Sequence, residues 1–181
     1  MNNNEIVRIM KIRCAIKEFD KSRIIADDDF SMLVEVARCS PSAFGLEPWR
    51  IIVLQNPEIR GAMKPFATGA QRQLDTCSHF AIFTVPTALD AESNYFRHIC
   101  LDVKGLDESS YKEFITKFKA FQEERQDLTN SRKRTDWAGK QAYIAMSTMM
   151  YAAAFKGIDS CPIEGFVPNA VNGLLNKYGY N

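Results

Sequence analysis

Apolar side chains recur at helical spacing in several stretches of this sequence, separated by prolines, glycines and polar runs. The clearest pattern places Phe30, Leu33, Val34 and Ala37 at positions i, i+3, i+4 and i+7, behind a turn rich in aspartate. It predicts an amphipathic helix over residues 27–40, which ends ahead of a proline. Shorter patterns predict further helices over residues 5–12, 57–65, 93–100, 109–125 and 169–178.

The stretch over residues 136–155 is apolar on nearly every side, which is typical of a helix buried in the centre of a domain. Asp136 is placed to cap its first turn, and Gly157 stands where a left-handed residue commonly ends a helix. The preceding residues 129–135 are polar and basic and are predicted to form an exposed loop. The apolar run over residues 142–155 is shorter than the roughly 20 residues of a membrane span. We therefore expect a buried helix and no membrane partner.

Two β-rich apolar runs, residues 49–54 and 80–85, predict strands that are buried on both faces. A third, short strand is expected over residues 159–163, after the long helix. Helical segments outnumber these strands, and 181 residues suit one domain with a substantial core. The pattern therefore predicts a helix-rich α+β fold as a single domain over residues 1–181.

The composition is that of an ordinary globular protein, with 46% hydrophobic and 25% charged residues. The 23 Lys and Arg nearly balance the 22 Asp and Glu, and the net charge of +1 predicts no general attraction to nucleic acid. The five cysteines are widely spaced without a C-x-x-C pair, and the N-terminal segment lacks the apolar core of a signal peptide. We therefore expect free thiols and a cytoplasmic protein.

The common nucleotide and metal motifs are missing from this sequence. It contains neither G-x-G-x-x-G nor G-x-x-x-x-G-K-[ST], and with only His79 and His98 it has no H-E-x-x-H motif. A zinc site and a Ser-His-Asp triad are poorly supported, and no metal is expected. Both histidines are interpreted as structural residues.

Three loop segments carry residues that could bind a ligand. Residues 13–20 combine cations with small residues on a non-helical stretch, where side chains and backbone amides can both reach an anion. Residues 40–50 are dense in small residues between a helix and a strand. Residues 162–166 hold a glycine that lets a backbone N–H approach a flat ligand closely. Each segment alone is better explained as a turn, and it is their joint order along the chain that favours a ligand site.

This order, on either side of the long helix, resembles the FMN-dependent nitroreductase family. The motif P-S-x-x-x-x-x-P-W begins at Pro41, and the motif G-I-D-x-x-P-I-E-G-F begins at Gly157. The resemblance runs from about residue 6 to about residue 175. It implies a central, mostly antiparallel sheet flanked by helices, a long buried helix at the interface of a homodimer, and one FMN per subunit.

The resemblance also implies roles for single residues at the FMN. Arg13 would hold the phosphate, and Lys17 would approach the pyrimidine edge, where an ammonium stabilises the negative charge of reduced flavin. Gln71 or Arg72 would reach the same edge. The phosphate and ribityl end would be lined by Cys14 and Ala15. One face of the ring would rest on Pro162, Ile163, Glu164 and Gly165. No side chain is assigned to catalysis, because the chemistry lies on FMN, with the Glu164 and Gly165 backbone near flavin N5.

A loop from the partner subunit would cover each FMN, and it corresponds here to Pro41, Ser42, Ala43 and Gly45. Many relatives carry Ser, Asn and Gln where this chain has Ala43, Gly45 and Glu47, so backbone contacts are expected at those positions. Relatives also continue past the point equivalent to Asn181 into a tail that wraps the partner and supplies Lys or Arg to the phosphate. This sequence ends before that tail, so the family's C-terminal extension is expected to be missing from it.

The activity implied by the resemblance is ping-pong hydride transfer from NADH or NADPH, through flavin N5, to an electron-poor acceptor such as a nitroaromatic or a quinone. Phe118 and Phe121 are candidates for stacking on the acceptor, although their spacing also suits core positions. One alternative is a non-catalytic protein of this fold that binds or sequesters FMN. Another is a thiol enzyme that uses Cys14 between two cations, although it lacks a placed histidine as base.

Overall fold

The computed structural model describes residues 3–87 and 89–180. The chain divides into two compact units, each assembled from segments that are distant in sequence. The first unit consists of Met1–Ala37, Ile51–Ile82 and Ser147–Asn181. The second consists of Arg38–Arg50 and Phe83–Met146. The single domain over residues 1–181 stays a prediction.

A two-stranded antiparallel sheet forms where two β-rich runs were expected. β1 (Arg50–Leu54) pairs with β2 (Phe80–Thr84). The Thr84 hydroxyl donates to the Arg50 carbonyl over 3.5 Å, which places the end of β2 against the start of β1. Both strands are mostly half-buried, so the prediction that they are buried on two faces is wrong. Of the residues in the two predicted runs, only Trp49, just before β1, and Leu54 are buried. The helices that flank the sheet therefore leave most of its side chains partly exposed within one chain.

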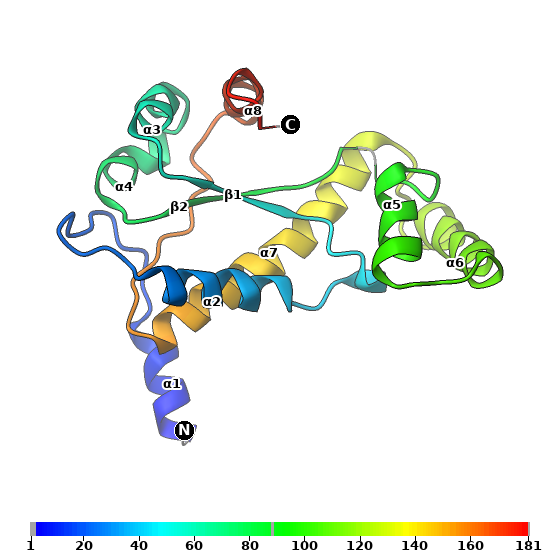
Figure 1. Cartoon of the computed structure of the whole chain (residues 1–181), viewed down its shortest axis with the longest axis horizontal. Helices are drawn as coiled ribbons and strands as arrows, with labels where there is room; N and C mark the ends of the chain where they lie inside the picture. Colours follow the sequence, from blue (N-terminus) through cyan, green and yellow to red (C-terminus); the bar gives the residue numbers. More distant parts are fainter. Residues whose placement is uncertain (1–2, 88, 181) are drawn as a thin grey trace. The chain divides into compact units, whose positions relative to one another are not determined.

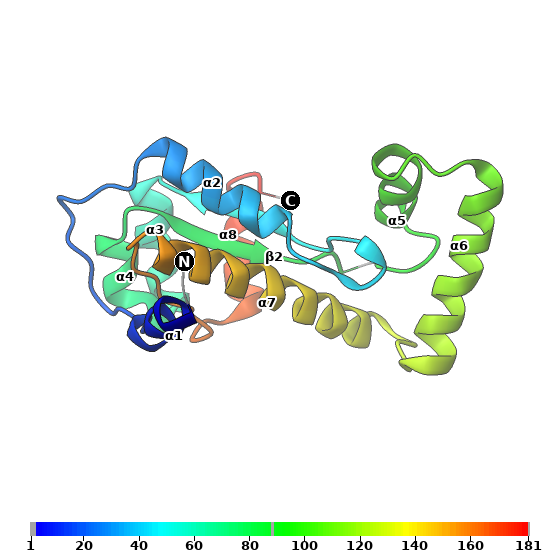
Figure 2. The same ribbon diagram turned by 90° about the horizontal axis from the view of Figure 1, so that it is seen from below.

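Helices of the first unit lie on both faces of this sheet (Figures 1 and 2). On one face are α3 (Pro57–Met63), α4 (Gln71–Thr76) and α8 (Pro168–Lys177). On the other are α2 (Asp27–Arg38) and the C-terminal half of α7 (Ser131–Phe155). Lys156 pairs with Asp29 over 2.8 Å, because α2 runs antiparallel to α7 and brings its start to the end of α7. α1 (Asn3–Ile12) precedes these elements.

The core of the first unit lies between the sheet and the helices α3, α4 and α8. It contains Leu54, Ile59, Met63, Ala67, Ala70, Leu74, Val171 and Leu175, all at most 5% exposed. Ala67 and Ala70 come from the irregular segment between α3 and α4. That segment is therefore fixed by burial on both sides of Thr68 and Gly69.

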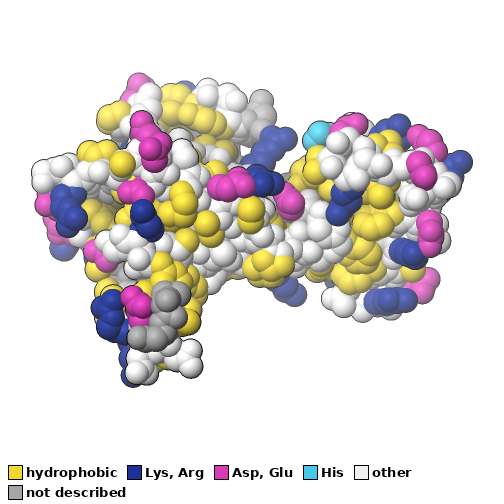
Figure 3. All heavy atoms as spheres, turned by 60° about the horizontal axis from the view of Figure 1, so that its bottom comes forward, with side chains coloured by type: hydrophobic (Ala, Val, Ile, Leu, Met, Phe, Trp, Pro, Cys, Tyr) yellow, Lys and Arg dark blue, Asp and Glu magenta, His cyan; other side chains and the backbone are white. Residues whose placement is uncertain are grey.

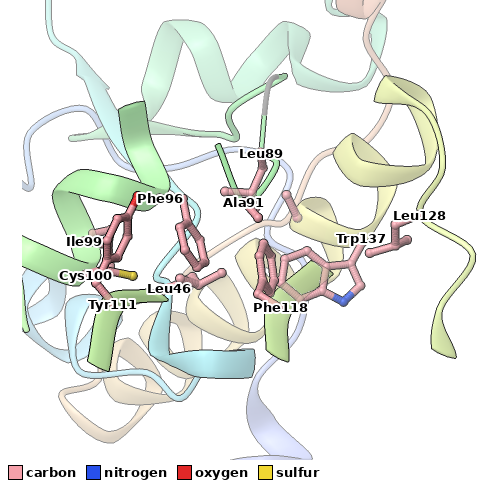
Figure 4. Packing of buried hydrophobic residues seen from close by; sticks show 11 residues of the cluster. Leu46, Leu89, Ala91, Phe96, Ile99, Cys100, Tyr111, Phe118, Leu128 and Trp137 are labelled. Atoms are coloured by element: carbon pink, nitrogen blue, oxygen red, sulfur yellow. The ribbon is translucent and has the colours of Figure 1, made fainter. Parts of the chain in front are cut away.

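The second unit is built on an aromatic core (Figure 4). α5 (Asn94–His98) continues into a π-helical turn over Ile99–Val103, and α6 (Glu108–Ala120) continues into another over Phe121–Arg125. The rings of Phe96 and Phe118 stack with centroids 4.7 Å apart, and Trp137 of α7 lies against Phe118 at 6.2 Å. Rings from α5, α6 and α7 therefore pack on one another in this core, in the stacked and tilted arrangements that aromatic pairs prefer.

The helix patterns at the two ends of the chain and in α2, α3, α5 and α6 are confirmed, but α7 starts earlier than predicted. It begins at Ser131, so the expected exposed loop over residues 129–135 is mostly helical. The Asn130 side chain accepts a hydrogen bond from the Lys133 N–H over 3.0 Å and so caps the first turn. Asp136, the predicted cap, instead pairs with Arg132 within the helix at 2.9 Å.

The third predicted strand, over residues 159–163, is wrong. Its place is taken by a single parallel bridge between Ser160 and Ala15. Pro162 removes a backbone donor two residues later, which prevents a longer ladder. The helix α4 was missed because Gln71–Thr76 holds little apolar periodicity, with Leu74 as its one large apolar side chain.

On the face that Figure 3 shows, charged side chains of both signs are mixed, in keeping with the near-zero net charge. Several large apolar side chains are also exposed, among them Ile6, Val7 and Met10 on α1 and Tyr143 and Ile144 on α7. Helix α7 is therefore buried on one side only within the chain. Among the described residues, no helix is both long enough and apolar enough to cross a membrane.

Candidate functional site

Two of the segments singled out in the sequence lie side by side in the first unit. Ala15 forms a parallel bridge with Ser160, and the Ile16 N–H donates to the Ser160 carbonyl over 3.4 Å. Arg13 is placed by α1, because its N–H donates to the Ile9 carbonyl over 3.1 Å. The fold therefore brings the basic segment that begins at Arg13 next to the residues that lead into Pro162.

Two polar atoms beside this bridge are buried without a hydrogen-bond partner in the described part of the chain. They are Nη1 of Arg13 and Oγ of Ser160. A buried donor left unpaired costs about 1–3 kcal/mol, and more when it is charged. A guanidinium nitrogen in this state suits an anionic ligand, because phosphate oxygens accept such hydrogen bonds in pairs.

A polar cluster surrounds the thiol of Cys161, one residue after the bridge. Lys17 Nζ lies 3.8 Å from Cys161 Sγ, and Gln73 Nε2 donates to the same sulfur over 3.5 Å. Gln73 is 4% exposed, so this donor to the Cys161 sulfur is a buried amide. Sequence reasoning missed Gln73, because only the rotation of α4 decides which of its glutamines points inward.

The two residues that were predicted to reach the flavin edge are engaged elsewhere in the first unit. Gln71 is exposed, and its Nε2 donates to the carbonyls of Lys64 and Ala67 over 2.7 and 3.0 Å. Arg72 pairs with Glu18 at 3.3 Å on the surface. Gln73, unlike Gln71 and Arg72, contacts the same Cys161 sulfur as Lys17.

The segment over residues 162–166 is exposed along most of its length, and its glycine contacts backbone. Gly165 accepts a hydrogen bond from the Gly69 N–H over 2.7 Å. Among the described residues none accepts a hydrogen bond from the Gly165 N–H. One backbone donor of this exposed segment therefore has no acceptor within the described residues.

In the second unit, the loop over residues 40–49 has an unusual backbone that is held by several hydrogen bonds. Phe44, Gly45 and Glu47 all have positive φ, at 58°, 56° and 46°. Left-handed conformations are strained for residues other than glycine, so two of these positions need support. The Gln141 side chain supplies it by accepting from the Ala43 N–H at 2.9 Å. The Phe44 ring is held between aromatic rings of α6 and the turn after it.

Most backbone donors of this loop are used within the second unit. The Gly45 N–H donates to the Ser42 carbonyl, and the Glu47 N–H donates to the Ser42 hydroxyl, both over 2.9 Å. The Ala43 N–H donates to Gln141. The expected backbone contacts at Ala43, Gly45 and Glu47 therefore cannot be made by their N–H groups in this conformation, and carbonyl or apolar contacts remain.

The two candidate aromatic residues differ in burial. Phe118 is fully buried, and its ring packs on Phe96, Phe44 and Trp137, so its role here is in the core. Phe121 is half-buried and contacts Phe44 edge-on at 4.9 Å. Of the two, Phe121 keeps some exposed surface for a ligand.

The histidines have structural surroundings. The His79 ring stacks on Phe30 with centroids 3.9 Å apart, and its Nδ1 lies 2.8 Å from the Ser78 hydroxyl. Burial, together with the Arg60 guanidinium, lowers the pKa of His79. His98 pairs with Asp102 on the surface at 2.8 Å. All five cysteines are free, and the described residues hold no cluster of His, Cys, Asp and Glu able to bind a metal.

Comparison with known proteins shows which family this chain resembles. The model of the nitroreductase family matches residues 10–178. A Staphylococcus epidermidis protein named "Putative NAD(P)H nitroreductase" is 44% identical over 177 residues, which cover 98% of this chain and 80% of the relative.

Solved structures give the same fold at lower identity. A Bacillus subtilis "putative nitroreductase ydfN" has a TM-score of 0.78 at 23% identity, covering 97% of this chain and 82% of the other. A "putative nitroreductase in complex with FMN" from Exiguobacterium sibiricum has a TM-score of 0.72 at 19% identity, covering 97% of this chain and 80% of the other. The match of the family model over nearly the whole chain, and the identity to the Staphylococcus protein, lead to one conclusion: this chain belongs to the nitroreductase family.

Proposed function

We propose that this protein is an FMN-dependent oxidoreductase that transfers hydride from NADH or NADPH to an electron-poor acceptor. The observation that carries the proposal is the buried, unpartnered Arg13 nitrogen, which lies in the segment that bridges to Ser160. A related structure of this fold is a complex with FMN, and the close relative is named for NAD(P)H. The residues present fit a flavin mononucleotide, because they pair a phosphate-type anion site with an open backbone donor.

Arg13 would bind the phosphate, which satisfies its orphan donor and neutralises charge in a partly buried place. Cys14 and Ala15 would line the phosphate and ribityl end. Lys17 would place its ammonium near the pyrimidine edge, where Gln73 lies close to it through the shared Cys161 sulfur. Pro162, Ile163, Glu164 and Gly165 would support one face of the ring. When bound, FMN supplies a ring that takes up a hydride and passes it on.

The role of the protein in this chemistry is to position and polarise. The Gly165 N–H is open to an acceptor, so it would donate to the ring edge beside the hydride-accepting atom. Lys17 would stabilise the negative charge that arrives with the hydride. Nicotinamide and acceptor would use the same exposed face in turn, which makes the kinetics ping-pong. Phe121 would contact the acceptor, and nitroaromatics and quinones are the acceptor classes proposed.

A homodimer would complete the site. The Pro41, Ser42, Ala43 and Gly45 loop of one chain would cover the FMN of the other. The exposed apolar residues Ile6, Val7 and Met10 of α1 would be covered by the second copy. Scattered apolar side chains are common on monomers, but three on one face of a ten-residue helix favour an interface.

Steady-state kinetics test the proposal. With protein loaded with FMN, NADPH oxidation measured at several concentrations of a quinone should give parallel double-reciprocal lines. FMN binding without NADPH or NADH turnover would instead support the non-catalytic, FMN-sequestering alternative. Activity that is lost in Cys14→Ser but independent of FMN would support a thiol enzyme. Free cysteines and the use of NAD(P)H suit the cytoplasm as the proposed location.

A further inference from the structure

The backbones of Gly69 and Gly165 lie so close together that neither residue has room for a Cβ. A Cβ built on Gly69 would lie 2.9 Å from the Gly165 Cα, and one built on Gly165 would lie 2.8 Å from the Gly69 Cα. Ordinary van der Waals contact begins at about 3.4 Å, so either methyl group would force the two backbones apart. Neither glycine has a positive φ, so lack of space, and not backbone conformation, selects glycine at both positions.

Two backbone hydrogen bonds fix this contact. The Gly69 N–H donates to the Gly165 carbonyl over 2.7 Å, and the Val167 N–H donates to the Phe66 carbonyl over 2.8 Å. The two segments are therefore tied together at the glycine pair and again on one side of it, where Val167 meets Phe66. The tie is rigid on the Gly69 side, because its neighbours Ala67 and Ala70 are 2% and 0% exposed in the core of the first unit.

We propose that Gly69 is a positioning residue for the flavin-binding backbone at Glu164 and Gly165. It acts through Gly165 and touches no ligand itself. With its carbonyl held by Gly69, Gly165 presents an N–H with no acceptor in the described chain, and its place is set by the buried segment beneath it. This inference rests on the proposed function, because it assigns to Gly69 the position of that donor relative to the ring.

Gly69→Ala is the direct test, since Gly165→Val would place a side chain in both the contact and the ligand site. Gly61→Ala and Gly173→Ala are matched controls in the same unit, because a Cβ at either position meets nothing within 4 Å. All variants would be loaded with FMN, and the dissociation constant, the flavin absorption spectrum and the rate of reduction by NADPH would be measured. Circular dichroism and thermal unfolding of the apoproteins would report the fold.

The expected result is a folded Gly69→Ala apoprotein with FMN binding weakened at least about tenfold and a shifted flavin spectrum. Reduction by NADPH should slow by up to about a hundredfold, because displacements near 1 Å at a reacting centre cost about that much. Both controls should behave as wild type. Equal FMN affinity, spectrum and reduction rate in Gly69→Ala and Gly61→Ala would overturn the inference.

A second measurement covers a Gly69→Ala chain that does not fold. In amide hydrogen exchange on the wild type, the Gly69 and Val167 amides should be protected without FMN, and the Gly165 amide should become protected when FMN is added. A Gly165 amide unchanged by bound FMN would overturn the inference together with the hydrogen bond assigned to Gly165, whereas FMN binding with NADPH turnover would still support the oxidoreductase activity. A wild-type chain that binds no FMN would instead overturn the proposed function.

Discussion

The hydroxyl of Tyr95 donates a hydrogen bond to the Leu46 carbonyl over 3.0 Å, and it also contacts the Glu47 carbonyl. Tyr95 belongs to α5, so this contact ties that helix to the end of the loop over residues 40–49. Burial, together with the Glu47 carboxylate, raises the pKa of Tyr95 to about 12. The loop proposed to cover the partner's FMN therefore depends on a protonated tyrosine.

The free energy of unfolding should decrease at alkaline pH, because the Tyr95 hydroxyl loses its proton. An unfolded tyrosine loses its proton near pH 10, whereas the folded one keeps it to about 12, so the folded state loses stability as pH rises between these values. Tyr95→Phe should be less stable at pH 8 by roughly 1–3 kcal/mol, because the carbonyls lose their donor. Between pH 10 and 12, Tyr95→Phe should lose less stability than the wild type, because it has no hydroxyl to titrate at this position. Urea unfolding at several pH values measures both, and identical pH profiles for the two proteins would contradict the prediction.

Arg13→Met should separate ligand binding from stability. It removes a buried donor without a partner, so the apoprotein should unfold at the same temperature or higher. FMN affinity should fall by roughly 2–5 kcal/mol, since the phosphate loses its charged partner. Arg23→Met makes the same chemical change at an exposed residue and should leave FMN binding unchanged. Tight FMN binding by Arg13→Met would show that the phosphate lies elsewhere.

Phe118→Ala should act on folding. Phe118 is fully buried among Phe96, Phe44 and Trp137, and emptying such a site costs about 3–5 kcal/mol. Phe121→Ala, at a half-buried position, should cost less stability and change the KM for the acceptor more. Denaturant unfolding and steady-state kinetics distinguish the two. A stable Phe118→Ala protein with only an altered KM would place its ring in the acceptor site.

Val7→Asp should weaken the proposed dimer. Val7 is 51% exposed on α1, where a charge costs little in a monomer but much inside an apolar interface. Val7→Ala is the control, since it removes volume without adding charge. Light scattering should show a dimer for the wild type and Val7→Ala, and dissociation for Val7→Asp. A wild-type chain that is monomeric with FMN bound would contradict the proposal of an interface.

The sequence predicted much of the helical frame, because apolar periodicity reports directly on burial. Phe30, Leu33, Val34 and Ala37 lie on α2 as expected, with Leu33 and Ala37 fully buried. Local capping chemistry was less decisive. Asn130 and Asp136 are both residue types that cap helices well. Asn130 caps α7 because it accepts from the Lys133 N–H, while Asp136 is paired with Arg132 inside the helix. A pattern of apolar residues does not report such side-chain bonds.

In the candidate site, too, the sequence predicted some residues and missed others. The sequence singled out the basic segment at Arg13 and the glycine at Gly165 from their composition and order. It could not identify Gln73, because inward orientation depends on the packing of a short polar helix. Nor could it identify Gly69, whose need for glycine comes from a backbone 96 positions away in the sequence and not from a local turn.

The central claim is that this chain binds FMN and uses it, and one anaerobic titration tests it most directly. Apoprotein is titrated with FMN while flavin fluorescence is followed, and NADPH is then added while the visible absorbance is recorded. We expect saturation at one FMN per chain, followed by bleaching of the bound flavin by NADPH or NADH and recovery of its colour when a quinone is added. A protein that binds no FMN, or binds it without bleaching by either nucleotide, would not be an FMN-dependent oxidoreductase.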